Sequence, residues 1–501
     1  MMHALRQASL PPLTQPAIIA IALTYFVIVA VIATWATRRI RNARDFFVAG
    51  AGVGLWTLAI AKMSTTLSGF SFVGGPGLVY TVGLTAVFII LPGALSNALG
   101  AWVLAKKMRL LGEVRGLLTV PGAIGARYRS PAAQGLAAVA LIVAAVGYLA
   151  TNLLALGIII DAIFSTGLSW GIWIGTGIIL AYSVAGGILA GIYTDVFQGT
   201  VMALSSVVVF FFALKSGGGM TQLSRTIMSA DATFLGPWGG AGPMTALSFF
   251  FVFSVGSLGQ PHVISKFYML RDPRQLKWYL LLMSVAMIVT QLLYFSVGIA
   301  TKALVTTGAL APLASPDQAT PTFVLHFTPV LVAGLVFAGV AAAIMATVNS
   351  FMNVGAAALM HDLPVAFGRR LGNELRWGRV STVVLALIAG GVAQASGTLV
   401  ALLGIFGWGL FASTIAPALA IGLNWDGATS AGAIASIATG LAITLIGETL
   451  GYYKLYALPA GASVTGLSLI VSILVFLVVS WLTRARAAAE IDPDIRLVME
   501  L

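Results

Sequence analysis

Two long apolar segments of this chain are interrupted by runs of glycine, serine and proline, at matching places in its two halves. The first run covers residues 68–77, inside a hydrophobic stretch that begins near Gly50. The second covers residues 254–262 and closes the apolar stretch that opens near Pro243. Breaks inside membrane helices free backbone carbonyls and helix ends, which can hold an ion or a solute near the bilayer midplane. Paired breaks are typical of secondary transporters built from inverted repeats.

Composition assigns the chain to the membrane. Its residues are 59% hydrophobic and only 8% charged, whereas soluble domains carry roughly 25% charged residues. Apolar runs of about 20 residues recur, and each can cross a hydrocarbon core of about 30 Å. The predicted fold class is an all-α polytopic membrane protein. We expect about thirteen transmembrane helices, at residues 17–36, 51–80, 84–105, 132–163, 169–190, 194–214, 243–263, 278–301, 329–360, 380–396, 398–422, 428–449 and 460–482.

The basic residues predict how these helices are oriented. If the N-terminus lies outside, 21 of the 27 lysines and arginines fall in cytoplasmic loops or the tail, among them Lys266, Arg271 and Arg274. Positive charge gathers on the cytoplasmic side of membrane proteins. We therefore expect a protein of the bacterial inner (plasma) membrane, with its N-terminus outside and its C-terminus in the cytoplasm. The net charge of +12 reflects this orientation and not a nucleic-acid interface.

The two breaks divide the chain into four parts. We expect an extra helix and a cytoplasmic loop over residues 1–50, a first inverted repeat over 51–214 and a second over 243–422. Residues 427–501 would add C-terminal helices and a cytoplasmic tail. Each repeat holds five spans and begins with a broken helix, so an odd number of spans places the two repeats in opposite orientations.

Polar side chains cluster around the first break, where they could form a shell of hard oxygens for Na⁺ or bind a small polar solute. An alternative is that the hydroxyls bond their own helix backbone or a neighbouring helix. The small residues of span 329–360 allow another helix to approach closely, and this span offers further polar groups. The polar residues of the two segments are Lys62, Ser64, Thr65, Thr66, Ser68 and Ser71, with Thr347, Asn349 and Ser350.

Two charged residues within the predicted spans are functional candidates. Asp195 is a functional candidate because burying a carboxylate in the membrane is costly, although it could instead cap the start of a helix. Lys62 lies about 12 residues, or about 18 Å, from the inner end of its span, which is too deep for its ammonium to reach the headgroups easily. Lys62 could replace a bound cation, carry a proton or pair with a carboxylate.

Five short motifs, in order along the chain, carry a family resemblance. With them the chain resembles the sodium:solute symporter family, which includes bacterial sodium/proline, pantothenate and sialic acid symporters. The resemblance implies a five-plus-five inverted-repeat core with broken helices, one added N-terminal helix and two C-terminal ones. The motifs are Ser68-Gly69 with 74–77, residues 182–187, Tyr193-Thr194-Asp195, residues 259–262, and residues 342–350.

The resemblance also implies sites for the coupling ion, Na⁺. The main site would take backbone oxygens from Ser64, Leu67 and Ala343 and the hydroxyl of Thr347. The chain departs from the family pattern at position 346, which is Ala in place of Ser and so lacks a second hydroxyl. Ser64 could supply a replacement oxygen, or Lys62 could occupy the place of the cation. A possible second Na⁺ site would use Asp195, Asn349 and Ser350.

For the solute, the resemblance implies a site between the two breaks. Thr66 and Phe253 differ from the acid and the Trp of the proline transporters, so proline is not singled out as the solute. The implied solute-binding residues are Thr66, Ser68, Ser71, Tyr148, Phe253, Ser257 and Gln260.

The resulting hypothesis is a Na⁺-coupled symporter that imports a small polar organic solute, an amino acid or a carboxylate, by alternating access. Alternatives are a proton-coupled or uncoupled carrier that uses Lys62, or a transporter-like membrane sensor. We expect no enzyme, because no nucleophile elbow, Walker loop or HExxH motif occurs. The expected partners are the solute and the lipid bilayer, with no obligate protein partner and no nucleic acid.

Overall fold

The computed structural model describes residues 14–38, 53–92, 96, 99–369, 371–397, 399–456, 458–459, 461–485 and 491–500. The side chains of residues 182 and 184–190 also lie outside the description, and with them most of the motif at 182–187. In the described part of the chain, the regular elements are all helices, with one isolated β-bridge between Val53 and Leu270.

Eleven described helices are long and apolar enough to cross a membrane, and the stretch Leu168–Ala181 is a shorter apolar helix. The expected count of thirteen is not confirmed. The predicted spans 169–190 and 194–214 are one continuous helix, α10 (Leu168–Ser216), because the backbone hydrogen bonds continue between them. The other long helices are α1 (Thr14–Thr37), α9 (Pro131–Phe164), α14 (Leu276–Thr306), α16 (Val330–Ala357), α18 (Glu374–Ala395), α19 (Val400–Ala416), α20 (Ser430–Tyr452) and α21 (Val464–Leu482).

The first predicted break is confirmed. Helix α3 (Leu55–Thr66) ends because Leu67 adopts an extended conformation, with φ −87° and ψ 128°. The chain then resumes as a π-helical turn, η2 (Phe70–Gly74), and as α4 (Gly75–Val82). Pro76 lies within the continuous helical run 70–82, and the Phe72 carbonyl, four residues before this proline, accepts a hydrogen bond from Thr320 Oγ1 at 2.7 Å instead of from the helix.

The second predicted break is confirmed as well. Helix α12 (Gly242–Gly256) tightens into a short 3₁₀ turn, η5 (Ser257–Gly259), and Gln260 is extended, with ψ 101°. After Gln260 the chain continues as α13 (Pro261–Ile264) and a 3₁₀ turn, η6 (Ser265–Met269). Pro261 begins the second half of this helix directly after the extended Gln260, where its missing N–H costs no helical hydrogen bond, whereas Pro76 lies well beyond the first break at Leu67.

The two broken helices meet at one end of the molecule. The Val53 N–H donates to the Met269 carbonyl at 3.1 Å, and the Arg271 N–H donates to the Val53 carbonyl at 3.0 Å. The start of the first broken helix is therefore tied to the end of the second, although more than two hundred residues separate them in the sequence.

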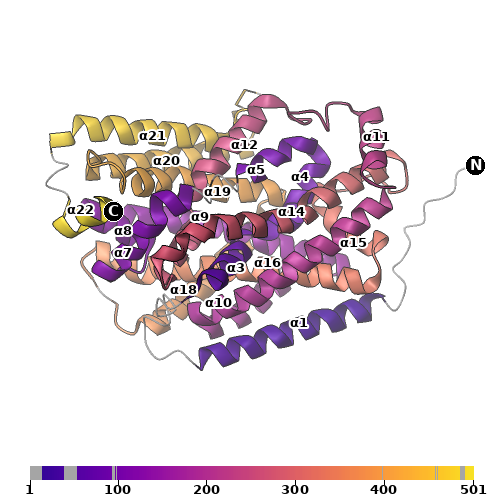
Figure 1. The fold of residues 1–501 in the computed structure, drawn as a ribbon, viewed down its shortest axis with the longest axis horizontal. Coiled ribbons are helices and arrows are strands. Elements are labelled where there is room, and N and C mark those ends of the chain that lie inside the picture. The colour runs from indigo at the N-terminus through magenta and orange to yellow at the C-terminus, as the bar shows by residue number, and fades with distance from the viewer. Residues whose placement is uncertain are drawn as a thin grey trace, which may run out of the picture.

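Polar elements gather at the two opposite ends of the bundle (Figure 1). Helices α7 (Lys106–Val114), α8 (Val120–Tyr128) and α22 (Pro493–Glu500) lie together at the left end in that view. Helices α11 (Met220–Ala230) and α15 (Ala319–Phe327) lie at the right end. Helices α11 and α15 lie in connections between the predicted spans, and α11 buries Leu223 and Ile227.

Candidate functional site

Helix α16 packs against the first break through one hydroxyl group. The buried Thr347 Oγ1 donates to the carbonyl oxygen of Leu67 at 2.9 Å and to that of Thr65 at 3.2 Å. These carbonyls face Thr347 because the helix has just lost its regular hydrogen-bond ladder. One hydroxyl and two carbonyl oxygens thus converge at one point. Hard cations prefer oxygen ligands of this kind.

The chain at the first break lies very close to α9. The Gly69 N–H donates to Asn152 Oδ1 at 2.9 Å, which satisfies a backbone donor that the break leaves free. A Cβ atom on Gly69 would lie 2.6 Å from the Cβ of Ala155, closer than atoms can normally approach. The glycine therefore allows the broken segment to pack between α9 and α16.

The remaining residues of the expected main Na⁺ site take different positions. The Ser64 hydroxyl donates to the sulfur of Met202 at 3.7 Å, so it is directed at α10 and not at Thr347. Ala343 is buried one turn before Thr347 on α16, and Ala346 is buried beside Thr347 without an oxygen on its side chain. The structure thus brings Leu67 and Thr347 together, with Thr65 as an additional carbonyl that was not predicted as a ligand.

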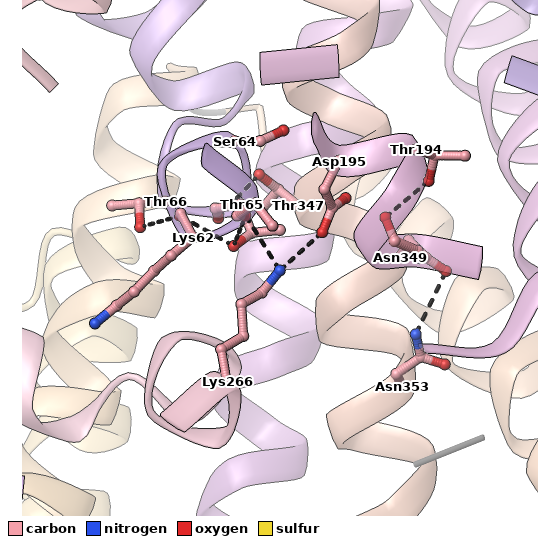
Figure 2. A network of polar contacts seen from close by, with 12 residues as sticks. Lys62, Ser64, Thr65, Thr66, Thr194, Asp195, Lys266, Thr347, Asn349 and Asn353 are labelled. Atoms are coloured by element: carbon pink, nitrogen blue, oxygen red, sulfur yellow. Dashed lines mark hydrogen bonds and ion pairs between the residues drawn. The ribbon is translucent and has the colours of Figure 1, made fainter. Parts of the chain in front are cut away.

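Lys62 does not lie among these oxygens. Its ammonium lies 3.8 Å from the ring centre of Phe267 and 4.7 Å from that of Tyr279, both favourable cation–π distances. Figure 2 shows the side chain pointing away from Thr347. In this conformation Lys62 does not occupy the place expected for the main cation.

A second cluster surrounds Asp195, whose side chain is held by a lysine from another part of the chain (Figure 2). Lys266 Nζ lies 2.7 Å from Asp195 Oδ2 and also donates to the Ala61 carbonyl at 3.1 Å. Asp195 and Lys266 are both buried, and Asn349 and Ser350 line the same small cavity. Asp195 lies inside the continuous helix α10, so the alternative that it caps a helix start is wrong.

The placement of Lys266 corrects another expectation. The sequence placed this residue with the basic residues of a cytoplasmic loop, as the neighbouring Arg271 and Arg274 suggested. In the structure Lys266 lies on η6 and is only 4% exposed, because the segment after the second break folds back against α3 and α10.

Most of the predicted solute-binding residues line one cavity, which lies between the two breaks and has a volume of about 70 Å³. A water needs about 10–15 Å³ on this scale, so there is room for a small solute. Ser68 is the exception, because it does not line the cavity. Its hydroxyl lies 3.2 Å from the hydroxyl of Tyr148, which does. The predicted residues that line the cavity are Thr66, Ser71, Tyr148, Phe253, Ser257 and Gln260.

With this geometry in place, the chain can be compared with known proteins. Residues 46–440 match the sequence profile of the sodium:solute symporter family. The chain belongs to this family. The family assignment makes it an integral protein of the plasma membrane and a symporter of a small solute, of the sodium-coupled class.

Individual members of the sodium:solute symporter family are distant in sequence but align along most of their length. The osmoregulated proline transporter of Bacillus subtilis is 26% identical over 479 residues, with 93% of this chain and 95% of the relative covered. The sodium/pantothenate symporter of Escherichia coli is 25% identical, with 91% and 94% covered. A Na⁺-coupled sialic acid symporter, solved in a substrate-bound outward-open state, superimposes with a TM-score of 0.76 at 18% identity, with 94% and 98% covered, and shares the fold.

The cavity of this sodium:solute symporter also includes side chains that sequence reasoning missed. Gln291 and Tyr294 come from α14 and Trp408 comes from α19. Gln291 carried a usable signal, since an amide in the middle of an apolar span is costly and usually functional. Trp408 carried none, because an aromatic residue in a membrane span usually contributes only to packing.

Proposed function

We propose that this chain imports a small polar organic solute, an amino acid or a carboxylate, together with Na⁺ by alternating access. One observation carries the proposal: four buried polar atoms without hydrogen-bond partners in the described part of the chain belong to residues that line the cavity between the breaks. A buried polar group without a partner is costly, so at the lining of a cavity such atoms can complete their hydrogen bonds with a ligand. They are Gln260 Oε1, Gln291 Oε1, Tyr294 OH and Trp408 Nε1.

The lining of the cavity supports this class of solute. Among the described residues that line it, none carries a charged side chain, so polar groups of the solute would meet amides, hydroxyls and an indole N–H. Phe253 stacks on Trp408 with ring centres 5.2 Å apart and on Phe70 at 6.1 Å, which forms an apolar wall for the carbon skeleton. The relatives named above are named for proline, pantothenate and sialic acid, each of which bears a carboxyl group.

The main cation would bind at Thr347, Thr65 and Leu67, where hydroxyl and carbonyl oxygens already converge. Ala343 and the Ser64 carbonyl complete the proposed ligand set. Leu67 also lines the solute cavity, so one residue would contact both ligands. A cation at the Leu67 carbonyl would hold the broken segment against α16 and fix the wall that the solute meets. Coupling requires this arrangement, because both ligands must prefer the same state.

The orientation that we propose places the end with α7, α8 and α22 in the cytoplasm and the N-terminus outside. The predicted cytoplasmic residues Lys106, Lys107 and Arg115 lie in or next to α7, at the end where α22 packs (Figure 1). Positive charge at one end of the bundle supports this orientation.

The test is uptake into proteoliposomes. A thermal-shift screen of amino acids and small carboxylates, with and without Na⁺, first identifies a solute that stabilises the purified protein. Uptake of that solute should then rise with an inward Na⁺ gradient and stay low when K⁺ replaces Na⁺. Uptake that responds equally to a pH gradient alone, and that is lost in Lys62→Met, would instead favour a proton-coupled carrier.

A further inference from the structure

We propose that Lys266 is a built-in cation for Asp195, so that this chain fills its second cation position with its own ammonium and not with Na⁺. The geometry shows an occupied site. Lys266 Nζ lies 2.7 Å from Asp195 Oδ2, which is a normal distance for a charge-assisted hydrogen bond. Asp195 is 2% exposed and Lys266 is 4% exposed, so water screens neither charge well.

The surroundings disfavour an additional free cation because of the charge of Lys266, and not for lack of space. The cavity beside the pair, lined by Asn349 and Ser350 among others, has a volume of about 20 Å³, which is enough for about one water molecule. A sodium ion in that space would lie close to the ammonium of Lys266, and two buried like charges repel strongly. Asp195 Oδ1 has no hydrogen-bond partner in the described part of the chain, so one carboxylate oxygen stays available if the ammonium is removed.

The pair also joins three elements that belong to different parts of the transporter. Asp195 lies on α10, Lys266 lies on η6 just after the second break, and the ammonium also donates to the carbonyl of Ala61 on α3. A free ion at this place could leave in each transport cycle. A lysine cannot leave, so the charge at Asp195 is compensated in every state in which these elements stay together. The consequence for transport, which rests on the proposed symport, is one coupled Na⁺ per solute at the Thr347 site.

The second buried lysine provides a matched control. Lys62 lies near the same elements, but its ammonium faces the rings of Phe267 and Tyr279. In the described part of the chain, the only salt bridge of Asp195 is to Lys266. Removing Lys62 should therefore open no cation site, whereas removing Lys266 should leave a carboxylate with neighbouring polar groups.

The experiment measures the thermal midpoint of the purified full chain in NaCl and in KCl at equal ionic strength, without solute, across a Na⁺ titration. The wild type should show a response to one Na⁺. Lys266→Met should be destabilised in KCl and should regain stability in NaCl, with a Hill coefficient for Na⁺ that rises from about 1 towards 2. Adding Asp195→Asn to Lys266→Met should remove the gain, and Lys62→Met should not produce it.

Two results would overturn the proposal. One is a folded Lys266→Met protein whose Na⁺ response equals that of the wild type. The other is a loss of Na⁺ response in Asp195→Asn with Lys266 intact, which would show that Na⁺ already binds at Asp195; this measurement does not depend on the folding of Lys266→Met. Because the readout needs no transport, failure of Na⁺-driven uptake would refute the proposed function while leaving these results interpretable.

Discussion

The surroundings of Thr347 and those of Asp195 present different chemical groups to a cation. At Thr347 the chain presents neutral oxygens from a hydroxyl and two carbonyls. At Asp195 it presents a carboxylate and binds that carboxylate with a lysine from the second broken helix. Neutral oxygens hold a cation without a buried opposite charge, which allows the ion to leave. A buried carboxylate without a cation would be costly in every state of the cycle.

Under the proposed cation sites, polar residues near a helix break do not all serve transported ions. The site at Thr347 uses backbone carbonyl oxygens that are free to bind only because the helix is broken at Leu67. The Asp195 place uses side chains on an unbroken helix and on the turn after the other break. The geometry at Thr347 would change if the broken segment moved. The ion pair at Asp195 instead links α10 and α3 to the second broken helix.

The largest effect on stability is expected when the buried ion pair is disrupted. Lys266→Ala leaves Asp195 buried without its cation and should reduce the free energy of unfolding by about 3–5 kcal/mol. The double variant Lys266→Met with Asp195→Asn removes both charges and should regain most of that loss. Denaturant unfolding of the purified protein in KCl measures both effects. Equal losses in the single and double variants would contradict the role of the pair.

The next test concerns the close approach of Gly69 to Ala155, which allows the broken segment to pack beside Thr347. Gly69→Ala puts a Cβ atom 2.6 Å from that of Ala155, and overpacking of this kind should cost about 1–3 kcal/mol. The Na⁺ response should weaken as well, because the broken segment is pushed away from α16. Gly54→Ala is the control, since no atom lies within 4 Å of a Cβ there. Rescue by Ala155→Gly would assign the loss to this contact; its absence would point to another cause.

Changing the single hydroxyl sharpens the comparison further. Thr347→Ala should lower the affinity for Na⁺ by about tenfold, which corresponds to about 1.4 kcal/mol, because the ion loses one of its oxygen ligands. Thr347→Ser keeps the hydroxyl and should retain most of the affinity. Ala346→Ser restores the family's second hydroxyl and should raise the affinity. Na⁺ titrations of thermal stability measure all three, and an unchanged affinity in Thr347→Ala would exclude this site.

The smallest effect is expected at an exposed ion pair, which serves as a reference for the buried one. Arg115, at the end of α7, binds Asp494 of α22, and its hydrogen bond holds the pKa of that carboxyl below its ordinary value. Docking of α22 should therefore gain from this pair above the ordinary Asp pKa and lose the gain as pH falls through the lowered pKa. Asp494→Asn should change stability by less than about 1 kcal/mol, because exposed pairs are screened by water and salt.

Hydrogen exchange of α22 as a function of pH and salt measures this release. Because the intrinsic rate of amide exchange itself falls as the pH is lowered, exchange is expressed as protection relative to the intrinsic rate at each pH. The expected result is lower protection of α22 at acid pH in the wild type and a weaker pH dependence of that protection in Asp494→Asn. An effect as large as that of Lys266→Ala would remove the contrast between buried and exposed pairs.

The sequence by itself determined the membrane class, the two breaks and much of the solute site. Composition and span length are properties of the whole chain. The breaks could be located because glycine and proline cluster there, although the first helix ends just before that run, at Leu67, and residues 70–82 with Pro76 among them are helical. Residues such as Thr66, Phe253 and Gln260 could be named because they lie at or beside those breaks, at positions that the family resemblance implies for the solute.

Only the tertiary structure decided which charges meet. The sequence offered Lys62 as the intramembrane lysine and placed Lys266 in a cytoplasmic loop, yet Lys266 is the one that reaches Asp195. Seventy-one positions separate these two residues, and Gln291 and Trp408 join the cavity from still more distant helices. Helical periodicity reports which face of a segment is apolar. The partner of that face depends on how α3, α10 and the second broken helix pack together, and this packing is a property of the folded chain.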